Sequence, residues 1–521
     1  MPKKRKPISP NAPRLNPYQR ILSRFYEPLI LLCILGRTRG EHRLADFPRS
    51  SDVTSWPLKY VRRLFLNQLA FLCDYDTGGD SVTAISIQHT PQQRIFWIAA
   101  NNSPCKKIIP FAQDSLLRLK CAAESRVAVD EAIDPFLAAC IDHAKPRIKA
   151  YSHFFTIQLK ACGENLENKA VEDQSYKLLL VWLKTFQSQS VKLEDLCKLA
   201  YNSRRCEEMR ILKGLCGEAH SQPERNSLQA KCRLLRHYIG RLGQYMKVVK
   251  TLFRSAPCLL NLLDDFKICP ISLPARTLPP STDGKTNLDS IAVRMLPAQS
   301  PDLARYQLAL FEMDTRFDIY AQYMEMYNED NFKPRVHAEV QILDFFHNNA
   351  LEFEESDIFV ACSKPACYCC SLYFHHHPLR PVTPASHQTI HKNWRPPDFV
   401  PGNNTQRDIL NKMIKDVRTE ALHQIDQRRR NAKWHPDSTT GITESISHLL
   451  DQEHLFGVTD LSEDLEDISS EASSLSFDEE TEGQDSNLLR ELDEWEPSHI
   501  KQLCSDWEED SDESGGVPVR L

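Results

Sequence analysis

Two short stretches decide the fold of this chain, KPRVHAEVQIL at residues 333–343 and SKPACYCC at residues 363–370. In the first stretch, His337 and Glu339 stand one residue apart in an otherwise apolar helical segment. Polar side chains of this kind are costly to bury unless they are paired or bind a ligand. The second stretch carries a Cys-x-x-Cys pair, which by itself is a weak indication of metal binding. Their meaning depends on whether the two stretches belong to one site.

The order of the motifs favours a single metal site. Zinc prefers nitrogen and sulfur ligands in tetrahedral geometry, and a catalytic zinc keeps its fourth position open. His337, Cys367 and Cys370 would supply one nitrogen and two sulfurs. The apolar residues 357–362 predict a buried strand of an α/β sheet between the motifs, and Pro365 would help to end it and start a helix. The simpler alternative is a buried histidine beside unrelated core cysteines.

Glu339 is expected to handle protons and not to bind the metal. In the middle of a helix, residues i and i+2 point apart. A site beyond the helix N-terminus can be reached from several first-turn positions, and the helix dipole there favours thiolates. Glu339 would take a proton from a water on the metal and pass it to a substrate.

Other nearby side chains offer competing interpretations. Cys369 forms a Cys-x-Cys spacing that is tighter than zinc sites usually show. Cys362 ends the predicted strand and is expected to pack against the site or support it. The histidines at 375–377 could bind metal, but a polar loop is favoured for them. His387 and His391 are candidates for substrate contacts or plain surface residues, and a surface position is favoured for His391.

These motifs resemble the nucleic-acid/nucleotide (cytidine) deaminase superfamily, whose signature is H-x-E…P-C-x-x-C. More narrowly, HAEVQIL, FVACSKPACYCC and SHQTIHKNWRPP resemble the OTT-type deaminase-like family, found mostly in fungal proteins. The resemblance implies zinc on His337, Cys367 and Cys370. It also implies a proton shuttle at Glu339 and a position near the substrate for His387.

The sequence departs from the family pattern at two places. Pro365 and Cys367 are separated by one more residue than in the superfamily signature. Gln388 stands where the family pattern leads us to expect glycine, directly after His387. The motifs cover about residues 335–399, and the rest of the chain is weakly constrained by the resemblance.

The resemblance implies a cytidine-deaminase-like three-layer α/β/α core, with a helix and a two-stranded hairpin before the H-x-E helix. Residues 57–75 have apolar side chains at helical spacing, and 81–88 and 94–100 read as two strands of a hairpin. We therefore expect this hairpin to supply the first two strands, with the mostly helical residues 105–330 as an insertion. The alternative is an independent N-terminal domain.

The hairpin would end in AANNS, which includes Asn101 and Asn102. The resemblance makes either asparagine a candidate for a substrate contact, and the alternative is an ordinary Asn-rich turn.

The expected organisation has four regions. They are a basic disordered tail at 1–16, a mostly helical region at 17–285 that contains the hairpin, a deaminase-like zinc domain at 286–432 and an acidic disordered tail at 433–521. Residues 270–280 are a proline-rich connector within this plan.

The net charge of −6 hides an asymmetry. Residues 460–513 contain 21 Asp/Glu and two Lys/Arg, a net of −19, so the rest carries −6 + 19 = +13. A basic body with an acidic tail favours a nucleotide or single-stranded nucleic-acid partner, and the alternative is a solvated surface with a solubilising tail. An odd count of 17 cysteines is typical of a reducing compartment.

No apolar run in the sequence is long enough to span a membrane, since the longest, residues 29–35, is far too short. We therefore expect an intracellular protein, in the nucleus or the cytoplasm. PKKRK at residues 2–6 is a candidate nuclear import signal.

The leading interpretation is a zinc-dependent hydrolytic deaminase of the cytidine or adenosine type, acting on a base in a nucleotide or nucleic acid. Trp97 and Trp394 are candidates for stacking on a base, although core packing is favoured for both. One alternative is a catalytically inactive deaminase-like scaffold with structural zinc, serving as a binding protein. Another is a structural zinc module closed by a fourth ligand, such as Cys369 or a nearby histidine.

Overall fold

A computed structural model describes most of the chain up to residue 427. The described residues are 17–35, 43, 45–48, 53–102, 104, 106–125, 129–167, 174–189, 192–216, 227–280, 282, 286–328, 332–400 and 402–427. All of them belong to one compact unit, Met1–Leu475. The tails predicted at 1–16 and 433–521, and with them the candidate import signal, lie outside the described residues.

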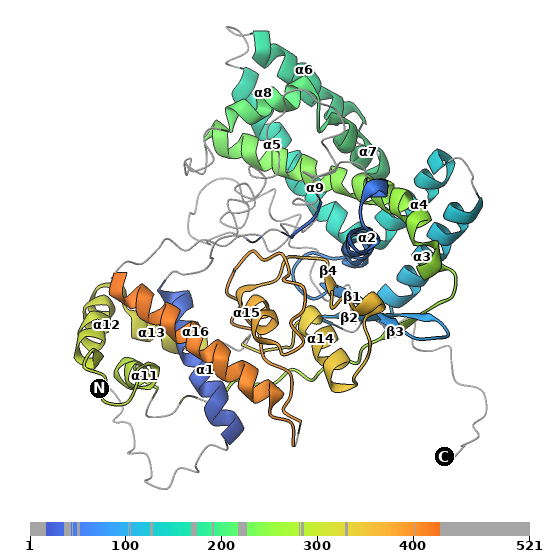
Figure 1. Cartoon of the computed structure of the whole chain (residues 1–521). Coiled ribbons are helices and arrows are strands. Elements are labelled where there is room, and N and C mark those ends of the chain that lie inside the picture. The colour runs from blue at the N-terminus through green and yellow to red at the C-terminus, as the bar shows by residue number, and fades with distance from the viewer. Residues whose placement is uncertain are drawn as a thin grey trace, which may run out of the picture. The chain divides into compact units, whose positions relative to one another are not determined.

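The described residues form a mixed α/β structure that is mostly helical (Figure 1). The helices are α1 (Pro17–Ile34), α2 (Leu58–Cys73), α3 (Ile108–Ser125), α4 (Val129–His143), α5 (Lys145–Glu167), α6 (Gln174–Gln189), α7 (Leu193–Ser203), α8 (Glu207–Leu215), α9 (Leu228–Ser255), α10 (Leu260–Leu263), α11 (Leu288–Met295), α12 (Leu303–Phe317), α13 (Ile319–Asn328), α14 (Ala338–Asn348), α15 (Tyr368–His376) and α16 (Thr405–Gln427). The strands are β1 (Thr83–His89), β2 (Arg94–Ala100), β3 (Phe266–Pro270) and β4 (Ala361–Cys362).

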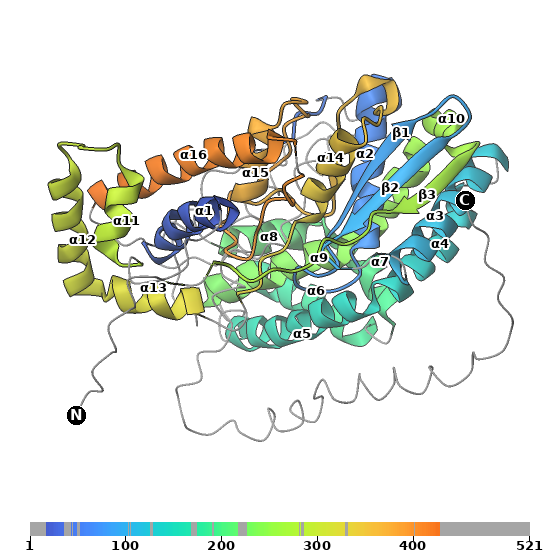
Figure 2. The ribbon, with the colours of Figure 1, turned by 90° about the horizontal axis from the view of Figure 1, so that it is seen from below.

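The four strands form one sheet in the order β3-β2-β1-β4. Figure 2 shows β1, β2 and β3 side by side. β1 and β2 pair as an antiparallel hairpin, and β4 pairs antiparallel with the other edge of β1, with Ala84 opposite Cys362. The predicted hairpin therefore shares a sheet with the strand predicted at 357–362, so that prediction is confirmed, although only Ala361–Cys362 are paired as a strand. β3, parallel to β2, was not predicted.

Helices cover both faces of this sheet. Side chains alternate along a strand, so Ile85 and Ile87 of β1 join the core beneath α2 and α9, whereas Ala84 joins the core beneath α14. Figure 1 shows α2 and α14 on opposite sides of the strands. Ala84 and its neighbour on β2, Ala99, are fully buried. Their small side chains allow α14 to lie close to the sheet.

Helices α3 to α10 lie between β2 and β3 in the chain and form a bundle around α9. The buried side chains of this bundle belong to the same apolar cluster as α2 and one face of the sheet. Gly243 of α9 allows the close approach of α7, because a Cβ there would lie 3.0 Å from the Tyr201 amide nitrogen. The bundle thus shares its core with the sheet.

A second group of helices packs on the other side of the sheet. Helices α1, α11, α12, α13 and α16 share an apolar cluster with α14 and α15, and α1 and α16 lie side by side (Figure 1). This cluster encloses the helices that carry the two motifs.

A buried polar group links the helical bundle to the sheet. Asp74, directly after α2, is fully buried and accepts hydrogen bonds from Ser81 Oγ and Ser363 Oγ. Arg147 of α5, 1% exposed, donates Nη1 to the Asp74 carbonyl oxygen at 2.7 Å and lies 3.4 Å from its carboxylate. Ser363 belongs to the second motif, so a residue of the bundle supports the segment that leads to Cys367.

We predict that Arg147→Met lowers the free energy of unfolding by about 3–5 kcal/mol, because it leaves a buried carboxylate without its arginine. Methionine keeps much of the volume of the side chain, so the loss of charge dominates. The matched control is Arg118→Met, since Arg118 forms an exposed pair with Asp114 and such pairs contribute about 0–1 kcal/mol. Urea unfolding measures both variants, and equal effects would contradict the prediction.

A half-buried carboxyl group, that of Asp344, joins the helices around the site. Gln406 of α16 donates Nε2 to Asp344 of α14 at 2.5 Å and to the Tyr373 hydroxyl of α15 at 2.9 Å. Burial raises the pKa of Asp344 to about 6. Because this exceeds the pKa of an unfolded aspartate, about 3.9, the folded state binds more protons between these values. The contribution of Asp344 to stability therefore falls as pH rises from about 4 to 6.

Asp344→Asn is accordingly expected to raise stability relative to the wild type at pH 8 and to lose most of this gain at pH 4.5. Asparagine stays neutral at both pH values and retains an oxygen for Gln406. Urea unfolding at the two pH values measures the difference, and a gain that is independent of pH would argue against a raised pKa.

Candidate metal centre

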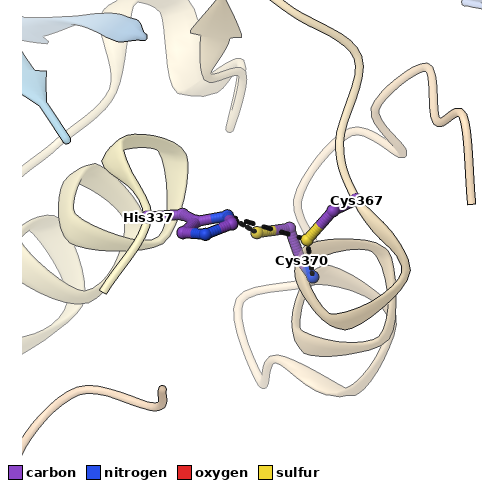
Figure 3. A group of neighbouring side chains, drawn as sticks. All are labelled: His337, Cys367 and Cys370. Atoms are coloured by element: carbon purple, nitrogen blue, oxygen red, sulfur yellow. Dashed lines mark hydrogen bonds between the residues drawn. The ribbon is translucent and has the colours of Figure 1, made fainter. Parts of the chain in front are cut away.

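The three predicted ligands lie at the N-termini of two helices. His337 is the residue before α14 and Cys367 is the residue before α15, and both have extended backbone conformations. Cys370 lies in the first turn of α15, and its amide donates to Cys367 Sγ at 3.4 Å. Figure 3 shows the histidine approaching from α14 and both cysteines from α15. Both helix N-termini are therefore directed at one place, which favours anionic ligands there.

The distances within the cluster fit a tetrahedral zinc ion. His337 Nδ1 lies 3.6 Å from Cys367 Sγ and 3.4 Å from Cys370 Sγ. All three ligand atoms lie within 4.8 Å of one another. With Zn–S near 2.3 Å and Zn–N near 2.0–2.1 Å, tetrahedral geometry separates the nitrogen from each sulfur by about 3.6 Å. Among the described residues, this group of histidine, cysteine and acidic side chains is the one that could hold a metal ion.

In the absence of a metal ion, the electrostatics of the cluster favour a thiolate at Cys367 and a protonated thiol at Cys370. Burial disfavours a Cys367 thiolate, but the hydrogen bond from Cys370 and the adjacent His337 lower the pKa of this thiol well below its usual value. Burial also disfavours a charged His337, whereas Cys367 raises its pKa. Burial, followed by Cys367, raises the pKa of Cys370 well above its usual value. The three side chains would release protons when a metal binds, because a metal binds thiolates and neutral imidazole.

Glu339 lies beside the cluster and outside it. It is 4% exposed in the first turn of α14, and its Oε2 lies 3.9 Å from Cys362 Sγ. Burial raises the pKa of its carboxyl group. A buried carboxyl group with a raised pKa can hold a proton and release it, and Cys362 contacts the site as expected.

Asn101 holds the end of β2 against the first motif. Its Oδ1 accepts a hydrogen bond from the Ala338 amide at 2.8 Å, and its Nδ2 donates to the Gly79 carbonyl at 2.8 Å. Its side chain is therefore used to position the start of α14. Asn102 is exposed, and a substrate contact by either asparagine stays a prediction.

His387 and His391 both lie close to the cluster. The His391 ring centroid is 6.1 Å from that of His337 and 5.7 Å from that of His387. His391 is half-buried, so the surface position favoured for it was wrong, because residues 393–395 pair with Arg335 and bring this segment over the site. His387 is 2% exposed, and its Nδ1 accepts from the Thr389 amide at 3.0 Å.

Gln388 has a left-handed backbone, with φ of 54°. Glycine adopts this conformation without strain, which explains why glycine is expected here. The Gln388 side chain compensates by donating Nε2 to Ser386 Oγ at 2.8 Å and Ser371 Oγ at 3.1 Å. It thereby ties the segment of His387 to α15.

Gln388→Gly and Gln388→Ala both remove these hydrogen bonds, but only glycine relieves the backbone. We expect the glycine variant to be the more stable of the two by about 1 kcal/mol. Thermal or urea unfolding of the pair measures the difference. Equal stabilities would show that position 388 carries no strain.

The surroundings of the other candidate residues show the role of each. Cys369 is fully buried near Cys33 and is not in the cluster. The polar loop expected at 375–377 was wrong, because α15 continues to His376, whose Nε2 lies 2.6 Å from Asp416. Trp394 is fully buried against Phe25, so core packing is confirmed.

Trp97, the other stacking candidate, packs on Phe345 and donates Nε1 to Gln88 at 2.8 Å. Trp97 is therefore a half-buried residue that packs between the sheet and α14.

Sequence reasoning missed the loop 76–80, which the motif DTGGD marks only as a helix terminator. Lys364 donates to the Gly78 carbonyl, and Arg335 donates to Asp80. Together with Asn101, three side chains from the site segments therefore hold this loop. The signal was the adjacent glycine pair, since Gly78 has φ of 79° and a Cβ on Gly79 would lie 3.1 Å from Arg335.

The fold and the site define a mixed α/β protein with a buried His/Cys/Cys cluster that could hold a metal ion. Residues 336–398 match the model of the OTT_1508-like deaminase family (OTT_1508_deam). The match includes all three cluster residues and Glu339, so the resemblance to an OTT-type deaminase-like family is confirmed. No curated protein and no solved structure matches the chain. Within the described part, no helix is both long and apolar enough to cross a membrane.

Proposed function

We propose that this protein is a zinc-dependent hydrolytic deaminase of a nucleotide or nucleic-acid base. The observation that carries the proposal is the spacing of the ligand atoms, 3.4 and 3.6 Å from His337 Nδ1 to the two sulfurs. The buried Glu339 beside them supports a catalytic site, because a purely structural zinc has no need of a group that carries protons. A structural zinc is also usually closed by a fourth protein ligand. Among the described residues, neither Cys369 nor a second histidine belongs to the cluster.

In this proposal His337, Cys367 and Cys370 hold the metal. Zinc bound by three ligands supplies Lewis acidity and makes water more acidic. Glu339 accepts a proton from the attacking water and delivers it to the amino nitrogen of the base, which leaves as ammonia. Burial, which raises the pKa of Glu339, suits a group that must both accept and donate a proton.

We further propose that β1, β2 and β4, with α2 on one face and α14 and α15 on the other, form a cytidine-deaminase-like three-layer core. The helical bundle inserted between β2 and α14 would then be an elaboration of that core. The pairing of β1 with both β2 and β4 supports this assignment.

The proposed substrate is a base in a nucleotide or in single-stranded nucleic acid, because the chain outside residues 460–513 is basic. Cytosine and adenine both remain in the proposal. The odd count of 17 cysteines supports a reducing compartment, and we place the protein in the nucleus or the cytoplasm.

The metal is tested first by measuring zinc per chain in the purified protein. About one zinc per chain is expected in the wild type and close to none in the Cys367→Ser/Cys370→Ser double variant, because two of three ligands are lost. Cys369→Ser is the matched control, since this neighbouring thiol lies outside the cluster, and it should retain the metal. A folded wild-type protein without zinc would remove the proposal.

Glu339→Gln separates an enzyme from an inactive deaminase-like scaffold. The variant should keep its zinc but lose turnover by at least about 100-fold, because general acid–base groups typically contribute 10²–10⁴-fold. The assay is ammonia release from nucleosides, nucleotides and single-stranded DNA and RNA. Zinc-loaded wild type without turnover on any of them would favour the scaffold.

A further inference from the structure

Three segments distant in sequence meet beside the candidate metal centre. The Thr277 amide donates to the Pro334 carbonyl at 3.3 Å, and Arg395 Nη2 donates to the Ala275 carbonyl at 2.7 Å. These bonds anchor the proline-rich connector on both sides of Arg276. The connector therefore holds Arg276 next to the first motif. That motif contains a second arginine, Arg335, two residues before His337.

Two guanidinium groups share one carboxylate at this place. Arg335 Nη1 forms a close ion pair with Asp80 Oδ1, and Arg276 Nη2 lies 3.6 Å from the same oxygen. The side chains of Asp80 and Arg276 are 63% and 44% exposed, whereas that of Arg335 is 17% exposed. The group is open to solvent and carries one positive charge in excess.

The loop that carries Asp80 is shaped for this contact. Gly78 has φ of 79°, and a Cβ on Gly79 would lie 3.1 Å from Arg335 Nη2. Two further side chains hold the loop, since Lys364 donates to the Gly78 carbonyl and Asn101 donates to the Gly79 carbonyl. The guanidinium group of Arg335 therefore packs against the backbone at Gly79, where a side chain would crowd it.

The arginines are also close to the candidate metal centre. Arg335 is two residues from His337, and its Nη1 lies 3.4 Å from the carbonyl oxygen of Asn101. Asn101 also accepts the Ala338 amide, which directly follows His337. The guanidinium group of Arg335 is therefore linked through one residue to the start of α14, where the candidate ligand His337 lies.

We propose that Arg335 and Arg276 form a phosphate subsite for the substrate, with Asp80 as the counter-ion that the phosphate displaces. The subsite rests on the proposed function, because it supplies the phosphate of the substrate whose base is deaminated. A guanidinium fork matches phosphate oxygens in pairs. An exposed ion pair with Asp80 is weak, and a phosphate monoester carries more charge than a carboxylate, so the exchange favours phosphate.

The test compares the dissociation constants of the full-length protein for the four common ribonucleosides and for their 5′-monophosphates, by calorimetry at low salt. At least one monophosphate should bind about ten-fold tighter than its nucleoside. Arg276→Ala should reduce this ratio several-fold, whereas Asp80→Asn should increase it, because the competing carboxylate is gone. Arg118→Ala, which removes an exposed arginine paired with Asp114, is the control and should leave the ratio unchanged.

Asp80→Asn decides between a phosphate subsite and a loop fastening. If Asp80 only fastens the loop, its loss should lower the ratio together with Arg276→Ala, and this result would overturn the proposal. The proposal is equally wrong if no monophosphate binds tighter than its nucleoside. Zinc content measured on the same samples separates these outcomes from a failure of the metal centre.

A single-stranded hexanucleotide without terminal phosphate distinguishes the source of the phosphate. Tighter binding of the hexanucleotide than of the monophosphate assigns the subsite to a nucleic-acid backbone. Weaker binding assigns it to a free nucleotide. In both cases the affinity should fall with added salt.

Discussion

The hydrogen bond from the Ala338 amide to Asn101 Oδ1 is the contact on which the candidate site depends. It joins residues 237 positions apart, and it fixes the end of β2 to the first turn of α14. This bond gives a partner to a backbone amide in the first turn of α14, where the helix itself offers none. A long insertion can therefore leave β2 and return to α14 while the metal ligands stay in place, since the entropy of closing a longer loop increases only slowly with its length.

Two buried groups of ionisable side chains lie near this contact. His337, Cys367, Cys370 and Glu339 lie together at two helix N-termini, and Asp74 with Arg147 forms a second buried group behind the second motif. Buried charges are costly unless each has a partner. The partners here come from the sheet, from α2 and from the helical bundle. The bundle therefore supports the candidate site through the contact of Arg147 with Asp74, which in turn binds Ser363 of the second motif.

The segments that hold the site are also the ones that reach its edge. Lys364, Arg335 and Asn101 each bind the loop at 78–80. Arg276 comes to the same loop from the connector after β3. A proline-rich connector and a glycine pair thus become parts of one surface. The Thr277 amide donates to the Pro334 carbonyl and the Arg395 side chain donates to the Ala275 carbonyl, and these bonds hold the connector in place.

The sequence by itself determined the three candidate metal ligands, Glu339 beside them, the helices that carry them, and the hairpin at 83–100. These follow from motif spacing, helical periodicity and alternating strands, which are local properties of the chain. The sequence also shows that Gln388 replaces the glycine expected from the family pattern. It does not show that the backbone there is left-handed. Only the tertiary structure decided that the hairpin joins β4 in one sheet, that His391 lies near His337, and that Arg147, Arg276 and Asp80 surround the site. Those contacts join residues far apart in the chain, and no local pattern specifies which distant segments will pair.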